Sequence, residues 1–232
     1  MDTSAHPGAS IREHVSIRSS ALRRRTRRLA LIGGGTDGNQ QLTTIAGTVL
    51  IVLLAALGVT ILRIHQLIWM HLFLGLLLLG PVGLKIASTG YRFVRYYTHD
   101  DQYTRKGPPE LPLRLLAPLV VLSTVTVFAS GVVLLFNGPA GRGQMLLVHK
   151  ASFIIWLGVT AIHVLGHLPG MPATLRTVLV RPRPGAAGAT SGAAGRWIAI
   201  AGAIVGGLVL AVALLPHFGA WTSGMFAHHH HG

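Results

Sequence analysis

The chain has 232 residues, of which 50% are hydrophobic and only 11% are charged, with a formal net charge of +14 and no cysteine. This composition excludes an ordinary soluble domain, and the lack of cysteine excludes disulfides and thiolate metal sites. The positive charge requires no nucleic-acid partner, because the basic residues are distributed as membrane topology demands.

Five apolar stretches are long enough to cross the hydrocarbon core of a bilayer, which needs about 20 residues. Backbone groups in lipid must be satisfied within a segment, and these stretches are too long and too continuously apolar for barrel strands. We therefore predict an all-α polytopic membrane protein whose spans lie at 42–62, 66–88, 113–136, 146–168 and 196–215.

The first four spans form a predicted four-helix transmembrane bundle at 42–168, and a fifth transmembrane helix follows at 196–216. Three polar segments lie outside these helices. We predict a disordered basic segment at 1–41, a flexible linker rich in Gly, Ala and Pro at 169–195, and a short tail at 217–232. The His228–His231 run in the tail is left out of the functional assignment.

Sixteen of the twenty Lys and Arg residues lie before the first span, between the second and third, or between the fourth and fifth. Only Arg63 and Arg142 lie in the remaining loops, and Lys85 and Lys150 fall within spans. This bias predicts a multi-pass protein of the plasma membrane with its N-terminus in the cytoplasm and its C-terminus outside.

Two histidines and two glycines are expected to share one layer near the outer surface. His71 and His149 lie about five and four residues into two spans that both run inward. Gly58 and Gly131 lie at similar distances from the outer ends of the two spans that run outward. At about 1.5 Å per residue, these four positions have nearly the same depth in the bilayer.

Such a layer suits a haem lying between the helices. Two imidazoles from facing helices can ligate the iron, and glycine lets a flat ring approach a helix backbone. We predict haem b with His71 and His149 as iron ligands and Gly58 and Gly131 beside the ring. In the alternative interpretation, the histidines are hydrogen-bond partners between helices and the glycines are ordinary packing residues.

A second, inner layer is less regular. His163 follows His149 by fourteen residues, which returns to about the same helix face after a rise of about 21 Å. The equivalent position on the other helix is Lys85. We predict a second haem if Lys85 and His163 are both ligands. Two other interpretations of Lys85 stay open. It can donate to a haem propionate or to a quinone oxygen, or its side chain can snorkel to the cytoplasmic interface without a ligand.

Three neighbouring residues are further candidates for this inner layer. His167 follows His163 by one helical turn and is an alternative inner ligand or an interfacial residue. Arg92 and Arg95 follow the second span and are candidates for pairing with propionates, because a guanidinium matches a carboxylate in a bidentate way. Their alternative role is ordinary anchoring on the cytoplasmic side.

The arrangement of a histidine, thirteen residues and a second histidine on one helix, facing a partner helix, resembles membrane b-type cytochromes. These include the four-helix core of quinol-oxidising cytochrome b and small bacterial cytochrome b and ferric-reductase-like bundles. The resemblance covers Gly47–His167 and implies ligand positions at His71, His149 and His163. Lys85 departs from the pattern, which has a histidine there.

These observations predict a haem-b electron carrier that passes electrons between the quinol pool and a redox partner protein on the outer side. The sequence has no glycine fingerprint for a nicotinamide or flavin nucleotide, so we expect a cytochrome subunit of an oxidoreductase complex. The alternative is a haem-free transporter or assembly subunit that uses its membrane histidines and lysine as polar contacts or a proton path.

Overall fold

The protein was analysed as a computed structural model, which describes residues 35–104, 111–167, 172 and 192–226. Five long helices make up most of this part of the chain, and every one is long and apolar enough to cross a membrane. The predicted all-α, polytopic membrane class is therefore confirmed. The five helices are α2 (Gly35–Leu62), α3 (Ile64–Tyr97), α5 (Leu111–Asn137), α6 (Gly143–His167) and α8 (Ala193–Ala213).

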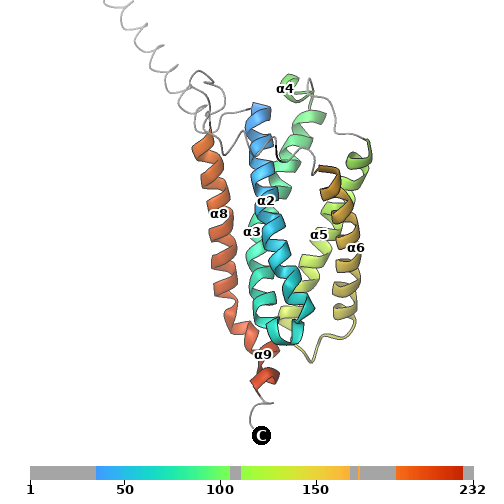
Figure 1. Ribbon diagram of the computed structural model, residues 1–232, viewed down its shortest axis with the longest axis vertical. Helices are drawn as coiled ribbons and strands as arrows, with labels where there is room; N and C mark the ends of the chain where they lie inside the picture. Colours follow the sequence, from blue (N-terminus) through green and yellow to red (C-terminus); the bar gives the residue numbers. More distant parts are fainter. Residues whose placement is uncertain (1–34, 105–110, 168–171, 173–191, 227–232) are drawn as a thin grey trace, which may run out of the picture.

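The first four long helices are arranged as two antiparallel pairs (Figure 1). Helix α2 packs along α3, and α5 packs along α6, whereas the two pairs meet mainly where α3 touches α5. Helices α3 and α6 run in the same direction, as the sequence predicts. We call the end where α3 and α6 begin the His71 end and the opposite end the Lys85 end.

Helix α3 is longer than its apolar stretch and continues to Tyr97. The sequence analysis ended this span at residue 88 and placed Arg92 and Arg95 after it, which is corrected here, since both arginines are on the helix. The polar composition after residue 88 marks the end of the apolar span. It does not end the helix, because Arg, Tyr and Val can continue a helix outside the hydrocarbon core.

The short helix α4 (Asp101–Thr104) follows and contacts α2 and α3. Helix α2 also begins earlier than expected, because residues 35–41 form its first turns and not the end of a disordered segment. The rest of that predicted segment, 1–34, lies outside the described residues, as does most of the predicted linker at 169–195.

The fifth helix, α8, docks on α3 at two glycines. A Cβ atom placed on Gly207 would collide with the backbone oxygen of Leu77, and one on Gly80 would collide with the backbone oxygen of Ala203. The Cα hydrogens of both glycines therefore face carbonyl oxygens of the other helix. Such Cα–H···O contacts are typical of helices that pack through small residues in membranes.

Pro81 makes this close approach more favourable. Proline has no backbone N–H, so Pro81 leaves the carbonyl oxygen of Leu77, four residues earlier, without its usual partner in the helix. An unsatisfied carbonyl is costly in lipid. Gly207 of α8 presents its Cα hydrogen to this same oxygen. Helix α8 thus compensates in part for the hydrogen bond that Pro81 removes from α3.

The C-terminal segment, residues 215–226, is helical and includes the first part of the short tail predicted at 217–232. After α8 the chain forms a 3-10 helix, η2 (Leu215–Phe218), and a short helix, α9 (Gly219–Phe226). Phe218 is only 2% exposed and packs against Leu76 of α3, Leu135 of α5 and Ala211 of α8. The indole N–H of Trp221 donates to the carbonyl oxygen of Leu135. The segment therefore joins α3, α5 and α8 at the His71 end.

We expect Gly207→Ala to destabilise the docking of α8, because the added methyl group would collide with the backbone of α3. A cost of about 1–3 kcal/mol is typical of overpacking a fitted contact. Gly206→Ala is the matched control, since its Cβ would meet nothing within 4 Å. Thermal unfolding of both variants in detergent should show a clearly lower transition temperature for Gly207→Ala only. Equal transition temperatures would contradict the close contact between α3 and α8 at Gly207.

Candidate functional site

His71 on α3 is held by a hydroxyl group of α2. The Nδ1 atom of its imidazole lies 3.0 Å from the Oγ1 atom of Thr60, which is buried. Thr60 already donates its hydroxyl hydrogen to the carbonyl oxygen of Leu57. The hydroxyl oxygen must therefore accept a hydrogen from Nδ1 of His71. In the neutral ring, this places the free lone pair on Nε2.

His149 on α6 is held in the same way by α5. Its Nδ1 atom lies 3.0 Å from the backbone oxygen of Val127 and 3.0 Å from the Oγ atom of Ser130. A carbonyl oxygen can only accept, so Nδ1 of His149 carries the hydrogen. Ser130 in turn donates to the same Val127 oxygen. The neutral ring of His149 again has its lone pair on Nε2.

The structure brings the two histidines together. They come from different helix pairs, yet their rings are close enough to interact electrostatically. Within the described residues, the hydrogen bonds of both rings are made by Nδ1 only. In metal sites a ligating histidine generally donates its other ring N–H to a protein acceptor, which fixes the tautomer and the ring orientation. The pair His71 and His149 thus fits two-imidazole ligation of a haem iron.

The two predicted glycines differ in their surroundings. A Cβ on Gly131 would lie 3.2 Å from Cε1 and 3.6 Å from Nδ1 of His149. Gly131 therefore makes room for the imidazole itself, whereas the sequence analysis assigned this space to a ring edge. A Cβ on Gly58 would meet nothing within 4 Å, so this position has open space beside it.

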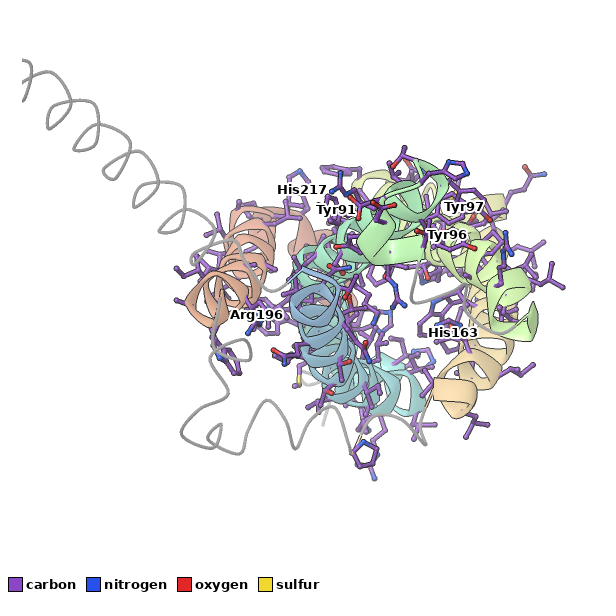
Figure 2. All side chains as sticks on the ribbon, turned by 90° about the horizontal axis from the view of Figure 1, so that it is seen from above. Tyr91, Tyr96, Tyr97, His163, Arg196 and His217 are labelled. Atoms are coloured by element: carbon purple, nitrogen blue, oxygen red, sulfur yellow. The ribbon has the colours of Figure 1, made fainter. Side chains whose placement is uncertain are left out.

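At the Lys85 end, the predicted inner residues are arranged differently. Nζ of Lys85 donates to the backbone oxygen of Thr43 on α2, at 2.7 Å. Lys85 is therefore held to α2 by this hydrogen bond. His163 is partly buried on the side of α6 that faces α2 and α3 (Figure 2). His167 is the last residue of α6, and its side chain lies outside the described part of the chain.

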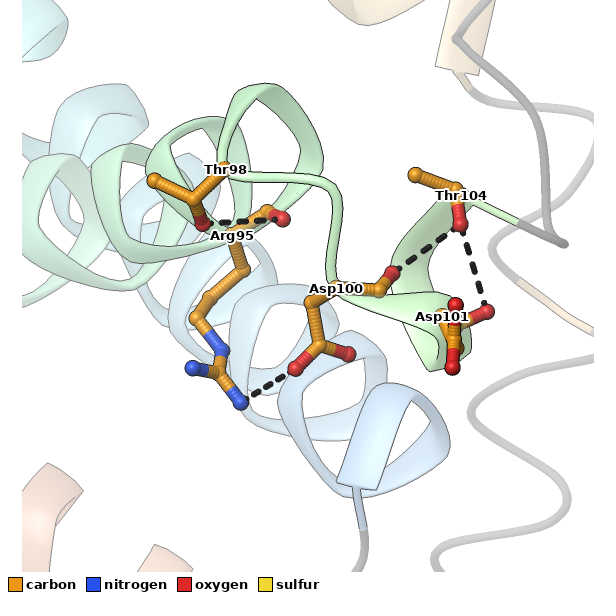
Figure 3. A network of polar contacts seen from close by, with 5 residues as sticks. All are labelled: Arg95, Thr98, Asp100, Asp101 and Thr104. Atoms are coloured by element: carbon orange, nitrogen blue, oxygen red, sulfur yellow. Dashed lines mark hydrogen bonds and ion pairs between the residues drawn. The ribbon is translucent and has the colours of Figure 1, made fainter.

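The side chain of Arg95 contacts other residues of the protein. It forms an ion pair with Asp100 (Figure 3), and its guanidinium lies 5.9 Å from the ring centre of Tyr91 and 6.0 Å from that of Tyr103. Burial, followed by the nearby Tyr91, raises the pKa of Tyr103, so its hydroxyl stays neutral at physiological pH. Arg92 is partly buried and close enough to Tyr103 to act on it electrostatically. These contacts fasten α4 to α3.

Sequence reasoning missed the hydroxyl groups that hold the histidines. Thr60 lies two residues after Gly58, and Ser130 directly precedes Gly131. A hydroxyl residue in the same layer as each histidine was therefore a usable signal. A second missed contact is the indole N–H of Trp156, which donates to Oγ1 of Thr124 at 2.9 Å and joins α6 to α5.

Within the described ranges, no group of three or more His, Cys, Asp or Glu side chains is placed to hold a metal ion. Comparisons of the whole chain with protein-family models, with curated proteins and with solved structures find no match. The site is therefore interpreted from its own residues.

We expect Gly131→Ala to weaken haem binding, because its methyl group would displace the imidazole of His149 by a few tenths of an ångström. Gly58→Ala is the matched control, as its methyl group meets no protein atom within 4 Å. Haem per polypeptide, measured in both purified variants, should fall in Gly131→Ala alone. A larger fall in Gly58→Ala would instead place the ring edge beside α2.

The two supporting hydroxyls should differ in importance. Thr60→Val removes the only acceptor that Nδ1 of His71 has among the described residues, whereas Ser130→Ala leaves Nδ1 of His149 bonded to Val127. Loss of such a partner typically weakens metal binding about tenfold or more. Titration of the haem-free protein with haemin should therefore show weaker binding for Thr60→Val than for Ser130→Ala.

Thr126→Val controls for the loss of a membrane hydroxyl, since among the described residues the Thr126 hydroxyl donates to Leu122 of its own helix. It should bind haemin as the unchanged protein does. If Thr60→Val also binds haemin normally, the hydrogen bond to His71 has no part in ligand orientation.

Proposed function

We propose that this protein is a haem-b electron carrier of the membrane, with His71 and His149 as the axial ligands of the iron. The observation that carries the proposal is the shared tautomer of the two rings. Each Nδ1 donates to a partner on the neighbouring helix, and each Nε2 keeps its lone pair in a layer where the two rings come close.

Helix–helix hydrogen bonding alone accounts for this pair less well. Lipid offers no hydrogen-bond partner, so a histidine that serves only as polar contact should use both ring nitrogens within the protein. In the described part of the chain, only Nδ1 of His71 and of His149 is used in this way. A ligand with an electron-pair acceptor would engage the Nε2 atoms.

When bound, haem b supplies one-electron chemistry between the ferric and ferrous states of its iron. The protein residues would bind and orient the group. Thr60 and the Val127 carbonyl hold the two imidazoles in the ligating tautomer, and Gly131 lets the ring of His149 sit against α5. The apolar helices around this layer exclude water from it.

The proposed cellular setting follows from the distribution of basic residues. We infer that the Lys85 end faces the cytoplasm and the His71 end faces outward across the plasma membrane, because sixteen of the twenty Lys and Arg residues lie in segments on the Lys85 side. The electrons would pass between the quinol pool and a redox partner protein on the outer side, as a cytochrome subunit of a larger complex.

Visible absorption spectra of the purified protein test the proposal. We expect a Soret band that shifts and sharpens on dithionite reduction, and its loss in His71→Ala and in His149→Ala, because each removes an iron ligand. His65→Ala, at an exposed position in the first turn of α3, is the control and should leave the spectrum unchanged. A colourless protein from haem-replete cells, or full haem content in both ligand variants, would refute the proposal.

A further inference from the structure

Lys85 is a charged residue in an apolar helix, and its side chain turns toward α2. Its Nζ atom donates to the backbone oxygen of Thr43 at 2.7 Å. The absence of a side chain at Gly47 makes this reach available, because a Cβ there would lie 3.2 Å from Nζ. The lysine thus lies in a polar group at the Lys85 end, where Asn39 and Thr43 of α2 also contact Ser88 of α3.

The charge of Lys85 has no carboxylate partner in the membrane. The sequence holds no Asp or Glu from residue 38 to residue 99, and none from residue 111 onward, so all five spans lack acidic residues. An ammonium group has three N–H donors, and the hydrogen bonds of the described residues use one of them. A partly buried cation in this position favours a ligand that brings acceptor oxygens.

A second unsatisfied polar group lies on α6. The Oγ1 atom of Thr160 is buried and has no hydrogen-bond partner among the described residues. His71 and His149 share a layer, Lys85 is fourteen residues beyond His71, and Thr160 is eleven beyond His149. At about 1.5 Å per residue, Lys85 and Thr160 therefore differ in depth by only about 4–5 Å.

The depth of these groups separates them from the histidine pair. Lys85 lies about 21 Å along α3 from His71, which is beyond the propionates of a haem held at His71 and His149. Lysine ligation of a second iron is also disfavoured, because Nζ of Lys85 donates to the backbone oxygen of Thr43 and an ammonium group has no lone pair for iron. The ligand of Lys85 is therefore a separate molecule.

We propose that Lys85 and Thr160 bind a membrane quinone through its carbonyl oxygens at the Lys85 end of the bundle. A quinone is an apolar ring with acceptor oxygens on opposite edges, so one molecule can accept from both α3 and α6. Helix α2 does not pack along α6, so the ring can approach from lipid without separating a helix pair. The site rests on the proposed function, which supplies the reason for electron exchange with a quinone.

Equilibrium dialysis against heptyl-hydroxyquinoline N-oxide, a soluble quinone analogue, tests the proposal on the full chain in detergent. Lys85→Met should weaken binding about tenfold or more, since a hydrogen bond from a charged donor is lost. Thr160→Val, which preserves shape, should weaken it by a smaller factor. Lys150→Met removes a lysine from an exposed position on α6 and should bind the analogue as the unchanged protein does.

Haem per polypeptide and circular dichroism are measured on the same samples. Unchanged helicity and haem content, together with weaker analogue binding in Lys85→Met and Thr160→Val, support the quinone site. No binding by the unchanged protein, or equal binding by Lys85→Met, overturns it. If Lys85→Met does not fold, equal binding by Thr160→Val overturns the proposal.

A ratio of two haems that falls to one in His163→Ala also overturns the quinone site, because iron would then occupy this layer. Analogue binding does not require haem to be detected. A haem-free protein that binds the analogue through Lys85 would therefore refute the electron-carrier proposal and leave the quinone site standing.

Discussion

A hydrocarbon core offers no hydrogen-bond partners, so each polar group in the five spans must be satisfied by the protein or by a ligand. This constraint accounts for most of the described polar contacts. Membrane hydroxyls such as Ser123 and Thr126 donate to carbonyl oxygens of their own helix. Trp156 bonds to Thr124 across the α5–α6 pair, and Gly207 approaches the carbonyl that Pro81 exposes. Among the described residues, the groups with unused hydrogen-bonding capacity include the two Nε2 atoms, the ammonium of Lys85 beyond its bond to Thr43, and the hydroxyl of Thr160.

The pairing of His71 with His149 could be predicted because transmembrane helices have a fixed rise per residue. Counting from the ends of the apolar stretches gave the depth of each histidine, and the shared direction of the two helices gave the layer. The hydroxyl partners depend on how each helix is rotated about its axis and on which neighbour it meets. Hydropathy does not contain that information, so Thr60 and Ser130 were found only in the structure.

The same limit applies to Lys85 and to the ends of the helices. Depth alone is compatible with a lysine that ligates, snorkels or binds a partner, whereas the contact with Thr43 depends on the direction of the side chain and on the space at Gly47. Helix α3 continues beyond its apolar stretch because hydropathy marks the membrane and not the helix. The fold of the C-terminal segment depends on Phe218 meeting α3, α5 and α8, which are distant in the sequence.

The position of that C-terminal segment has a consequence for biosynthesis. The two helix pairs touch mainly through α3 and α5, and η2 with α9 binds to both of these helices. These residues are the last part of the described chain to leave the ribosome. Until they are made, the described contacts between the two hairpins are mainly those of α3 with α5, so the chain passes through a stage in which its halves are less firmly joined. If the proposed haem is inserted during that stage, it would meet a bundle that is still open, and the folding of η2 and α9 would then close the His71 end behind it.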